Sequence, residues 1–177
     1  MNPNEAFDLT DVVLVISSLD KEGALFYEQE QVVPYIAAGD SVMVGGCAGQ
    51  ELVRDEWGNI VEGAFGYWRE FSIRSSTPVP AQGFAPHAES FTLSEVRADV
   101  TRATPHSYSG YVTINGGVFD ACDKVMITAT LEDDNIIVAG YSAVIDKPAN
   151  GVATYFKIPA EGLPQHNSYY LDVIPWE

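Results

Sequence analysis

The side chains best suited to chemistry are carboxylates, and some recur in pairs. Asp8 with Asp11 and Asp120 with Asp123 share one spacing, and Glu132–Asp134 is an acidic run inside a turn. Oxygen clusters can hold Ca²⁺, and two carboxylates about 5 to 10 Å apart can hydrolyse glycosides. The chain has no DxDxDG loop, however, and adjacent carboxylates in a turn point in different directions. We therefore interpret them as solvated turn residues and predict no metal site and no catalytic carboxylate.

Histidines and cysteines are the second set of candidates. His87, His106 and His166 lie in APHAES, TPHSYS and PQHNSY, and with no HExxH or HxH pattern we interpret them as exposed loop residues. Cys47 lies in GGCAG, which looks like a nucleophile loop but is followed by no convincing helix. A disulfide between Cys47 and Cys122 and a pair of buried thiols both stay open. No cofactor and no catalytic residue is predicted.

Aromatic residues give a mild binding signal. Trp57, Tyr67, Trp68 and Phe71 all lie near or within residues 51–71. Aromatic side chains on an exposed sheet face can stack on sugars or anchor a protein partner. In a strand, Tyr67 and Phe71 would share one face and Trp68 would occupy the other. We predict a binding surface at these four residues, and packing in a core or between domains is the alternative.

The overall composition narrows the classes of function. The chain has 177 residues, 46% of them hydrophobic, which is enough for a packed core in one large or two small domains. A formal net charge of −16, from 25 acidic and 9 basic residues, argues against nucleic acid and anionic membranes as partners. No run of 18 apolar residues is present, so no membrane span is expected in this chain.

The elements that must position these side chains come from an internal repeat. Phe119 lies 112 positions after Phe7, and the same offset continues without a gap for nearly forty residues. The aligned pairs include Phe7 and Phe119, Asp8 and Asp120, Asp11 and Asp123, Val13 and Val125, Leu19 and Leu131, Val32 and Val144, and Gly39 and Gly151. The offset predicts two copies of one β-structure, although strand alternation alone could produce part of the match.

Within each copy the pattern is that of antiparallel strands. VVLVISSL (12–19) and KVMITATL (124–131) are apolar and rich in β-branched residues, and each is followed by a turn and a returning strand. A third strand is expected to begin at SVMV (41–44) in the first copy and at VATYFKI (152–158) in the second. The closing strand of the second copy is YYLDVIPW (169–176), and its equivalent in the first copy is REFSIRSS (69–76). In FTLSEVRADV (91–100) the apolar residues do not keep one phase, which predicts a bulge or a bend.

These strands predict an all-β protein of two tandem immunoglobulin-like antiparallel β-sandwiches. The first is a diverged repeat over 1–76 with an inserted hairpin, the second is complete over 91–177, and a proline-rich linker over 77–90 joins them. The counterparts of the strands after Phe91 would fall before Met1, so the first domain lacks one or two strands. A longer native chain, the inserted hairpin or another copy could supply them. An unpaired edge strand in the first domain would allow a homodimer.

The second half resembles the FxLYD family of small bacterial β-sandwich domains. The family motif is an aromatic residue, any residue, Leu, Tyr and Asp, followed by a turn and a strand. The corresponding segments here are ATLEDDNIIVAG and DKPANGVATYFKIP. Leu131 and Asp133 match the motif, whereas Ala129 replaces the aromatic residue and Glu132 replaces the tyrosine. SGYVTINGG is similar to another strand of the family. The resemblance implies an extracellular or lipid-anchored surface protein without assigned chemistry, and it transfers no catalytic residue.

We therefore expect a non-enzymatic module for binding or spacing at the bacterial cell surface or outside the cell. Its partner would be an unidentified protein or a glycan of the cell envelope. MNPNEAFDLTDVV contains no recognisable signal peptide, and we expect that an export signal has been removed. The alternative function is a carbohydrate-binding module that uses the aromatic residues of the 51–71 insertion.

Overall fold

The computed structural model describes the chain except residues 20–21, 45–67, 102–103, 135, 161–165 and 177. The described residues contain strands and two short 3₁₀ helices and no α-helix, which confirms the predicted all-β class. The strands are β1 (Phe7–Leu19), β2 (Leu25–Ile36), β3 (Trp68–Pro80), β4 (Phe91–Thr101), β5 (Thr104–Ile114), β6 (Lys124–Asp133), β7 (Ile136–Asp146), β8 (Thr154–Pro159) and β9 (Ser168–Trp176). The 3₁₀ helices are η1 (His87–Glu89) and η2 (Gly117–Ala121). None of the described helices has the length and apolar character that crossing a membrane requires.

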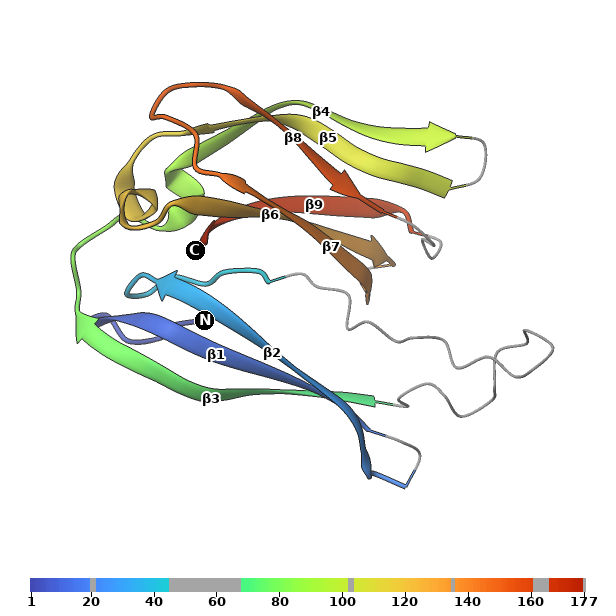
Figure 1. The fold of residues 1–177 in the computed structure, drawn as a ribbon, viewed down its shortest axis with the longest axis horizontal. Helices are drawn as coiled ribbons and strands as arrows, with labels where there is room; N and C mark the ends of the chain where they lie inside the picture. The colour runs from blue at the N-terminus through green and yellow to red at the C-terminus, as the bar shows by residue number, and fades with distance from the viewer. Residues whose placement is uncertain (20–21, 45–67, 102–103, 135, 161–165, 177) are drawn as a thin grey trace.

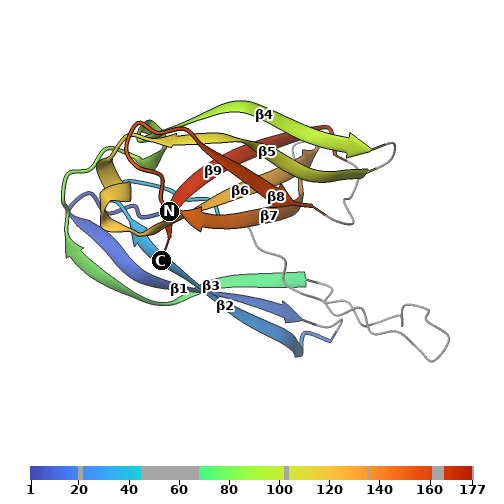
Figure 2. The ribbon, with the colours of Figure 1, turned by 45° about the horizontal axis from the view of Figure 1, so that its top comes forward.

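The strands form three antiparallel sheets of three strands each within the described chain. We call them the first-repeat sheet (β2-β1-β3), the outer sheet (β4-β5-β8) and the central sheet (β7-β6-β9). Figures 1 and 2 show them as three layers, with the central sheet between the other two. Hydrophobic clusters connect the central sheet to each of its neighbours.

The two segments that the predicted repeat aligns have the same sheet order. The hairpins β1-β2 and β6-β7 correspond, and in each copy a later strand, β3 or β9, pairs with the free side of the first strand. Gly39 and Gly151, which the repeat aligns, both have a positive φ, of 73° and 76°. The two hairpins nevertheless differ in register by one residue. Val13 lies opposite Val32, and the repeat aligns these two residues with Val125 and Val144. Val125 lies instead opposite Ile145, the next residue along the chain.

Strand β6 is buried on both faces, which explains its nearly unbroken apolar sequence. Val125, Ile127, Ala129 and Leu131 point into the main hydrophobic cluster, which strands of the outer and central sheets share. The alternate residues face the first-repeat sheet, where the Met126 sulfur accepts a 4.0 Å hydrogen bond from Gln31. A second, smaller cluster joins the first-repeat sheet to the last strand of the chain through Val12, Val33, Ile36, Leu9, Val42, Val44 and Trp176.

Three details of the predicted strands can be compared with the structure. The bulge expected in 91–100 is present, because the pairing of β4 with β5 shifts between Ser94 and Arg97. The prediction of a strand at 41–44 is wrong, because this segment is not β-structure. Its Met43 amide donates to the Asp172 side-chain carboxylate and not to the backbone of a neighbouring strand. Strand β3 extends to Pro80 and so includes the first residues assigned to the 77–90 linker. The predicted hairpin in the insertion lies outside the described residues.

Candidate functional site

A buried histidine connects three distant parts of the chain. His87 belongs to the 3₁₀ helix η1 in the connection between β3 and β4, and it is 4% exposed. Asp40 follows the turn at the end of β2, and Asp172 lies in the last strand, β9. The His87 ring stacks beside Phe91 with 6.2 Å between the ring centroids. The prediction that His87 is an exposed loop residue is therefore wrong, because η1 places the ring between the two repeats.

Both ring nitrogens of His87 bond to carboxylates. Nδ1 lies 2.9 Å from Oδ2 of Asp40, and Nε2 lies 2.8 Å from Oδ1 of Asp172. The His87 backbone amide also donates to Oδ2 of Asp40, at 2.9 Å. A protonated imidazole donates from both nitrogens, so this geometry fits the imidazolium form between two carboxylates. We call these three residues the His87 bridge.

The surroundings of the His87 bridge set its charge state. Burial by itself lowers the pKa of His87, but the hydrogen bonds and charges of Asp172 and Asp40 outweigh it and raise that pKa to about 9. Burial tends to raise the pKa of Asp40, and the bonds from the His87 ring and backbone outweigh it and lower that pKa. Both shifts favour the ion pair of a charged His87 with the Asp40 carboxylate near neutral pH.

The bonding of the His87 bridge limits its chemistry. A general base needs a free ring nitrogen near a substrate proton, and both nitrogens are occupied here. The carboxylates are occupied as well: Asp40 Oδ1 accepts from the Ser41 amide at 2.7 Å, and Asp172 Oδ2 accepts from the Met43 amide at 3.1 Å. Among the described residues, no group of three or more His, Cys, Asp or Glu side chains could hold a metal ion. The arrangement fits a structural connection.

Asp8 forms a second buried polar cluster. It is 1% exposed, and its carboxylate accepts bonds from the Tyr35 hydroxyl and from the backbone amides of Ala38 and Gln82, both at 2.8 Å. Burial first, and then the Asp8 carboxylate, raise the pKa of Tyr35 above its ordinary value. The interpretation of Asp8 as a solvated turn residue is wrong, because it ties the start of β1 to the segments after β2 and β3.

The other acidic candidates are only partly the solvated turn residues that the sequence predicts, because Glu132 and Asp133 are half-buried in strand β6 and Asp11 lies within β1. Asp11, Asp120, Asp123 and Asp134 are exposed. Asp120 Oδ1 accepts a bond from Asn150 at 3.4 Å, and Asp120 and Asp123 line a surface pocket with Lys124 and Lys147. The repeat therefore aligns a buried Asp8 with an exposed Asp120, so equal position in the repeat does not mean an equal role.

The predicted aromatic surface is described in part. Phe71 lies in β3 with 65% of its surface exposed, as a binding role would require. Trp68 begins β3 opposite Leu19. Trp57 and Tyr67 lie outside the described residues. The structure therefore does not bring the four side chains into a described site, and the binding surface stays a prediction.

The cysteines and remaining histidines complete the candidates. Cys122 is a buried free thiol whose Sγ donates to the Phe119 carbonyl at 3.2 Å, and burial raises its pKa. Its predicted partner Cys47 lies outside the described residues, and the disulfide stays a prediction. His166 bonds through Nε2 to the Tyr108 hydroxyl at 3.1 Å, and the side chain of His106 lies outside the described residues.

Sequence reasoning missed the His87 bridge, although one signal was present. Asp172 interrupts the apolar closing strand YYLDVIPW. A carboxylate next to the apolar run Val173–Ile174 is expected to have a partner, because an unpaired buried charge is costly. That pattern indicates a buried ion pair, but it does not identify which of the three histidines supplies the partner.

Comparisons with protein-family models, with curated proteins and with solved structures find no match for this chain. The resemblance to the FxLYD family therefore stays a prediction from short motifs.

Proposed function

We propose that the chain is a non-enzymatic binding or spacing module of a bacterial cell surface or of the space outside the cell. One observation carries the proposal: the His87 bridge uses both ring nitrogens and both carboxylates to hold three segments together. A buried ionisable cluster is the usual place to look for catalysis. Here its atoms serve the connection between the repeats.

We also propose that the second half is an immunoglobulin-like sandwich of FxLYD type. The main hydrophobic cluster supports this, since Tyr108 and Phe156 of the outer sheet pack with Ile127 and Val173 of the central sheet. The first-repeat sheet is then a modified copy that packs on the other face of the central sheet. The acidic net charge of −16 suits a soluble exported protein.

The alternative function, a carbohydrate-binding module, is favoured by one observation. Phe71 exposes 65% of its surface on β3, next to the predicted insertion aromatics. A solvated aromatic ring on a sheet offers a flat apolar face on which a sugar can stack. Trp57 and Trp68 would then provide further stacking surfaces.

The functions separate in one set of binding and turnover assays. The whole chain is screened against a glycan array and against cell-envelope proteins, together with Trp57→Ala, Trp68→Ala and the control Tyr155→Ala on the outer sheet, where Tyr155 is 54% exposed. A carbohydrate-binding module would lose a glycan signal in the first two variants and keep it in the control. A spacer would give no signal in any protein. Turnover of model glycoside or ester substrates, lost on a single carboxylate substitution, would overturn the proposal.

A further inference from the structure

Strand β3 is an exposed edge of the first-repeat sheet. It pairs with β1 on one side, and no described strand pairs with its other side. Residues 70–78 are all exposed, and Phe71 and Ile73 expose 65% and 56% of their surfaces. Pro78 and Pro80 lack the amide hydrogen that a further strand needs, so only the part before them can pair.

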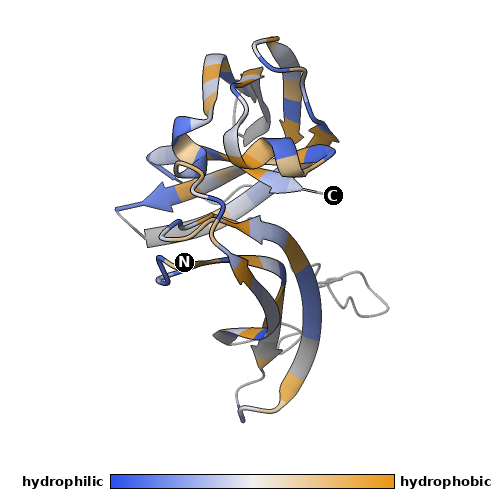
Figure 3. Ribbon diagram, turned by 90° about the vertical axis from the view of Figure 1, so that its left-hand side faces the viewer, coloured by the Kyte–Doolittle hydropathy of each residue, from blue (hydrophilic) through white to orange (hydrophobic). Residues whose placement is uncertain are grey.

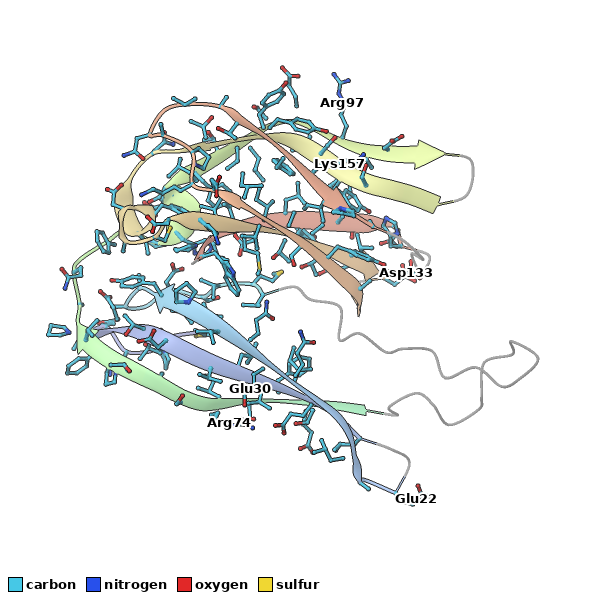
Figure 4. All side chains as sticks on the ribbon, viewed as in Figure 1. Glu22, Glu30, Arg74, Arg97, Asp133 and Lys157 are labelled. Atoms are coloured by element: carbon cyan, nitrogen blue, oxygen red, sulfur yellow. The ribbon has the colours of Figure 1, made fainter. Side chains whose placement is uncertain are left out.

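The two faces of β3 differ in character. One face of the sheet is polar at two successive rungs. Val15 of β1 lies between Ser72 of β3 and Glu30 of β2, and Ser17 of β1 lies between Glu70 of β3 and Glu28 of β2. Arg74 belongs to this face, because its guanidinium pairs with Glu28 at 2.7 Å and also with Glu30. Figure 4 shows Arg74 and Glu30 pointing toward each other on the first-repeat sheet.

The opposite face of β3 is apolar. Phe71 lies opposite Ile16, and Ile73 lies opposite Leu14. Bands of apolar and polar residues follow one another along the strands of this sheet (Figure 3). Five successive residues, Glu70–Arg74, thus alternate between a polar face with charged ends and an apolar face.

We propose that β3 pairs antiparallel with β3 of a second copy of this chain, centred on Ser72. In this register Glu70 lies opposite Arg74 of the other copy, and Phe71 lies opposite Ile73. Opposite charges and aromatic with β-branched residues are the favourable cross-strand pairs. Each pair occurs twice, because a two-fold axis passes between the two Ser72 residues and makes the interface self-complementary.

Charge explains why the partner would be a second copy at this edge and in this register. Two chains of net charge −16 repel each other over most of their surfaces. Arg69 and Arg74 give β3 two of the nine basic residues of the chain, against one acidic residue, Glu70. The pairing places Arg74 beside Glu70 twice and joins the two first-repeat sheets into one sheet of six strands, β2-β1-β3-β3-β1-β2. The inference does not depend on the function proposed above.

The register is tested by cross-linking. Opposite Cα atoms in an antiparallel pair are about 4.5 to 5.5 Å apart, within the range of a disulfide, so Ser72→Cys is expected to link two copies in oxidising buffer. In Ser75→Cys the two cysteines would lie six positions apart along the strands, roughly 20 Å, and should not link. Both variants carry Cys47→Ser, so that the remaining native thiol is the buried Cys122. Equal linking of the two variants, or linking of Ser75→Cys alone, would overturn the register.

Association itself is tested by light scattering over a concentration series. The mass of the native chain is expected to rise from 19.2 kDa toward twice that value with concentration. Glu70→Arg places arginine opposite Arg74 and is expected to weaken dimerisation several-fold. Glu5→Arg makes the same charge change near the Pro80 end of β3, far from residues 70–74, and should not weaken it. Loss of net negative charge by itself favours association, so the predicted weakening has the opposite sign to a general charge effect. A native chain that stays at 19.2 kDa to its solubility limit would refute the pairing.

Discussion

Raising the pH above neutrality should weaken the folded chain through the His87 bridge. Histidine in the unfolded chain titrates near 6.5, and the pKa of His87 in the folded chain is about 9. The folded state keeps a proton that the unfolded chain releases between these values. The stabilising contribution is therefore complete below about pH 6.5 and is lost as the pH rises through about 9. At about 1.4 kcal/mol per pKa unit it amounts to roughly 3 kcal/mol.

The contribution is measured as the difference between two proteins. Urea unfolding of the native chain and of His87→Gln, followed by tryptophan fluorescence, gives the free energy of unfolding of each at a series of pH values from 6 to 10. Subtracting the two curves removes the general effect of a net charge of −16, which is common to both. We expect the advantage of the native chain over the variant to shrink by about 3 kcal/mol across this range.

Two outcomes bear on the geometry directly. The groups that face the His87 ring are Asp40, Asp172 and the Phe91 ring. A ring-nitrogen NMR titration should show the imidazolium form of His87 at pH 7.5. If the two unfolding curves stay parallel from pH 6 to 10, or the ring is neutral at pH 7.5, the bridge does not hold a charged histidine.

Three further substitutions follow from local packing. Gly117→Ala should destabilise the chain, because its new Cβ would lie 2.5 Å from the Ser90 side chain. Gly83→Ala is the control, since Gly83 has a similar φ but open space around it, and equal melting temperatures of the two variants would contradict the prediction. Asp8→Asn should cost about 1 to 3 kcal/mol in urea unfolding at pH 7, since the side chain bonds three donors; an unchanged midpoint would show that the carboxylate is dispensable. Phe119→Ala, at a fully buried position, should cost about 3 to 5 kcal/mol by the same assay, and a loss below about 1 kcal/mol would place Phe119 outside the core.

The strands were predictable because their signal is local. Alternation and β-branched residues in KVMITATL and VVLVISSL determine strand conformation over a few residues, and the 112-position offset then implies the same sheet order twice. The segment SVMV carried the same local signal and was predicted wrongly. Its apolar residues Val42 and Val44 are partly buried against the second cluster, and a contact of that kind comes from tertiary packing.

The His87 bridge was not predictable because it is assembled from distant positions. Asp40 is 47 positions from His87, and Asp172 is 85 positions from it. None of the three lies in a motif with fixed spacing, and the bridge exists only where the turn after β2, helix η1 and strand β9 meet. Buried Asp8 illustrates the same limit: its repeat partner Asp120 is exposed, and their sequence surroundings do not distinguish them.

The packing of the last strand against the first repeat has a consequence for synthesis. Trp176 covers the cluster of Val12, Val33 and Ile36, and Asp172 completes the His87 bridge. A ribosome adds about 5 to 20 residues per second, so strands β1 and β2 emerge roughly 7 to 30 seconds before these contacts can form. During that interval the earliest part of the chain has no completed core of its own.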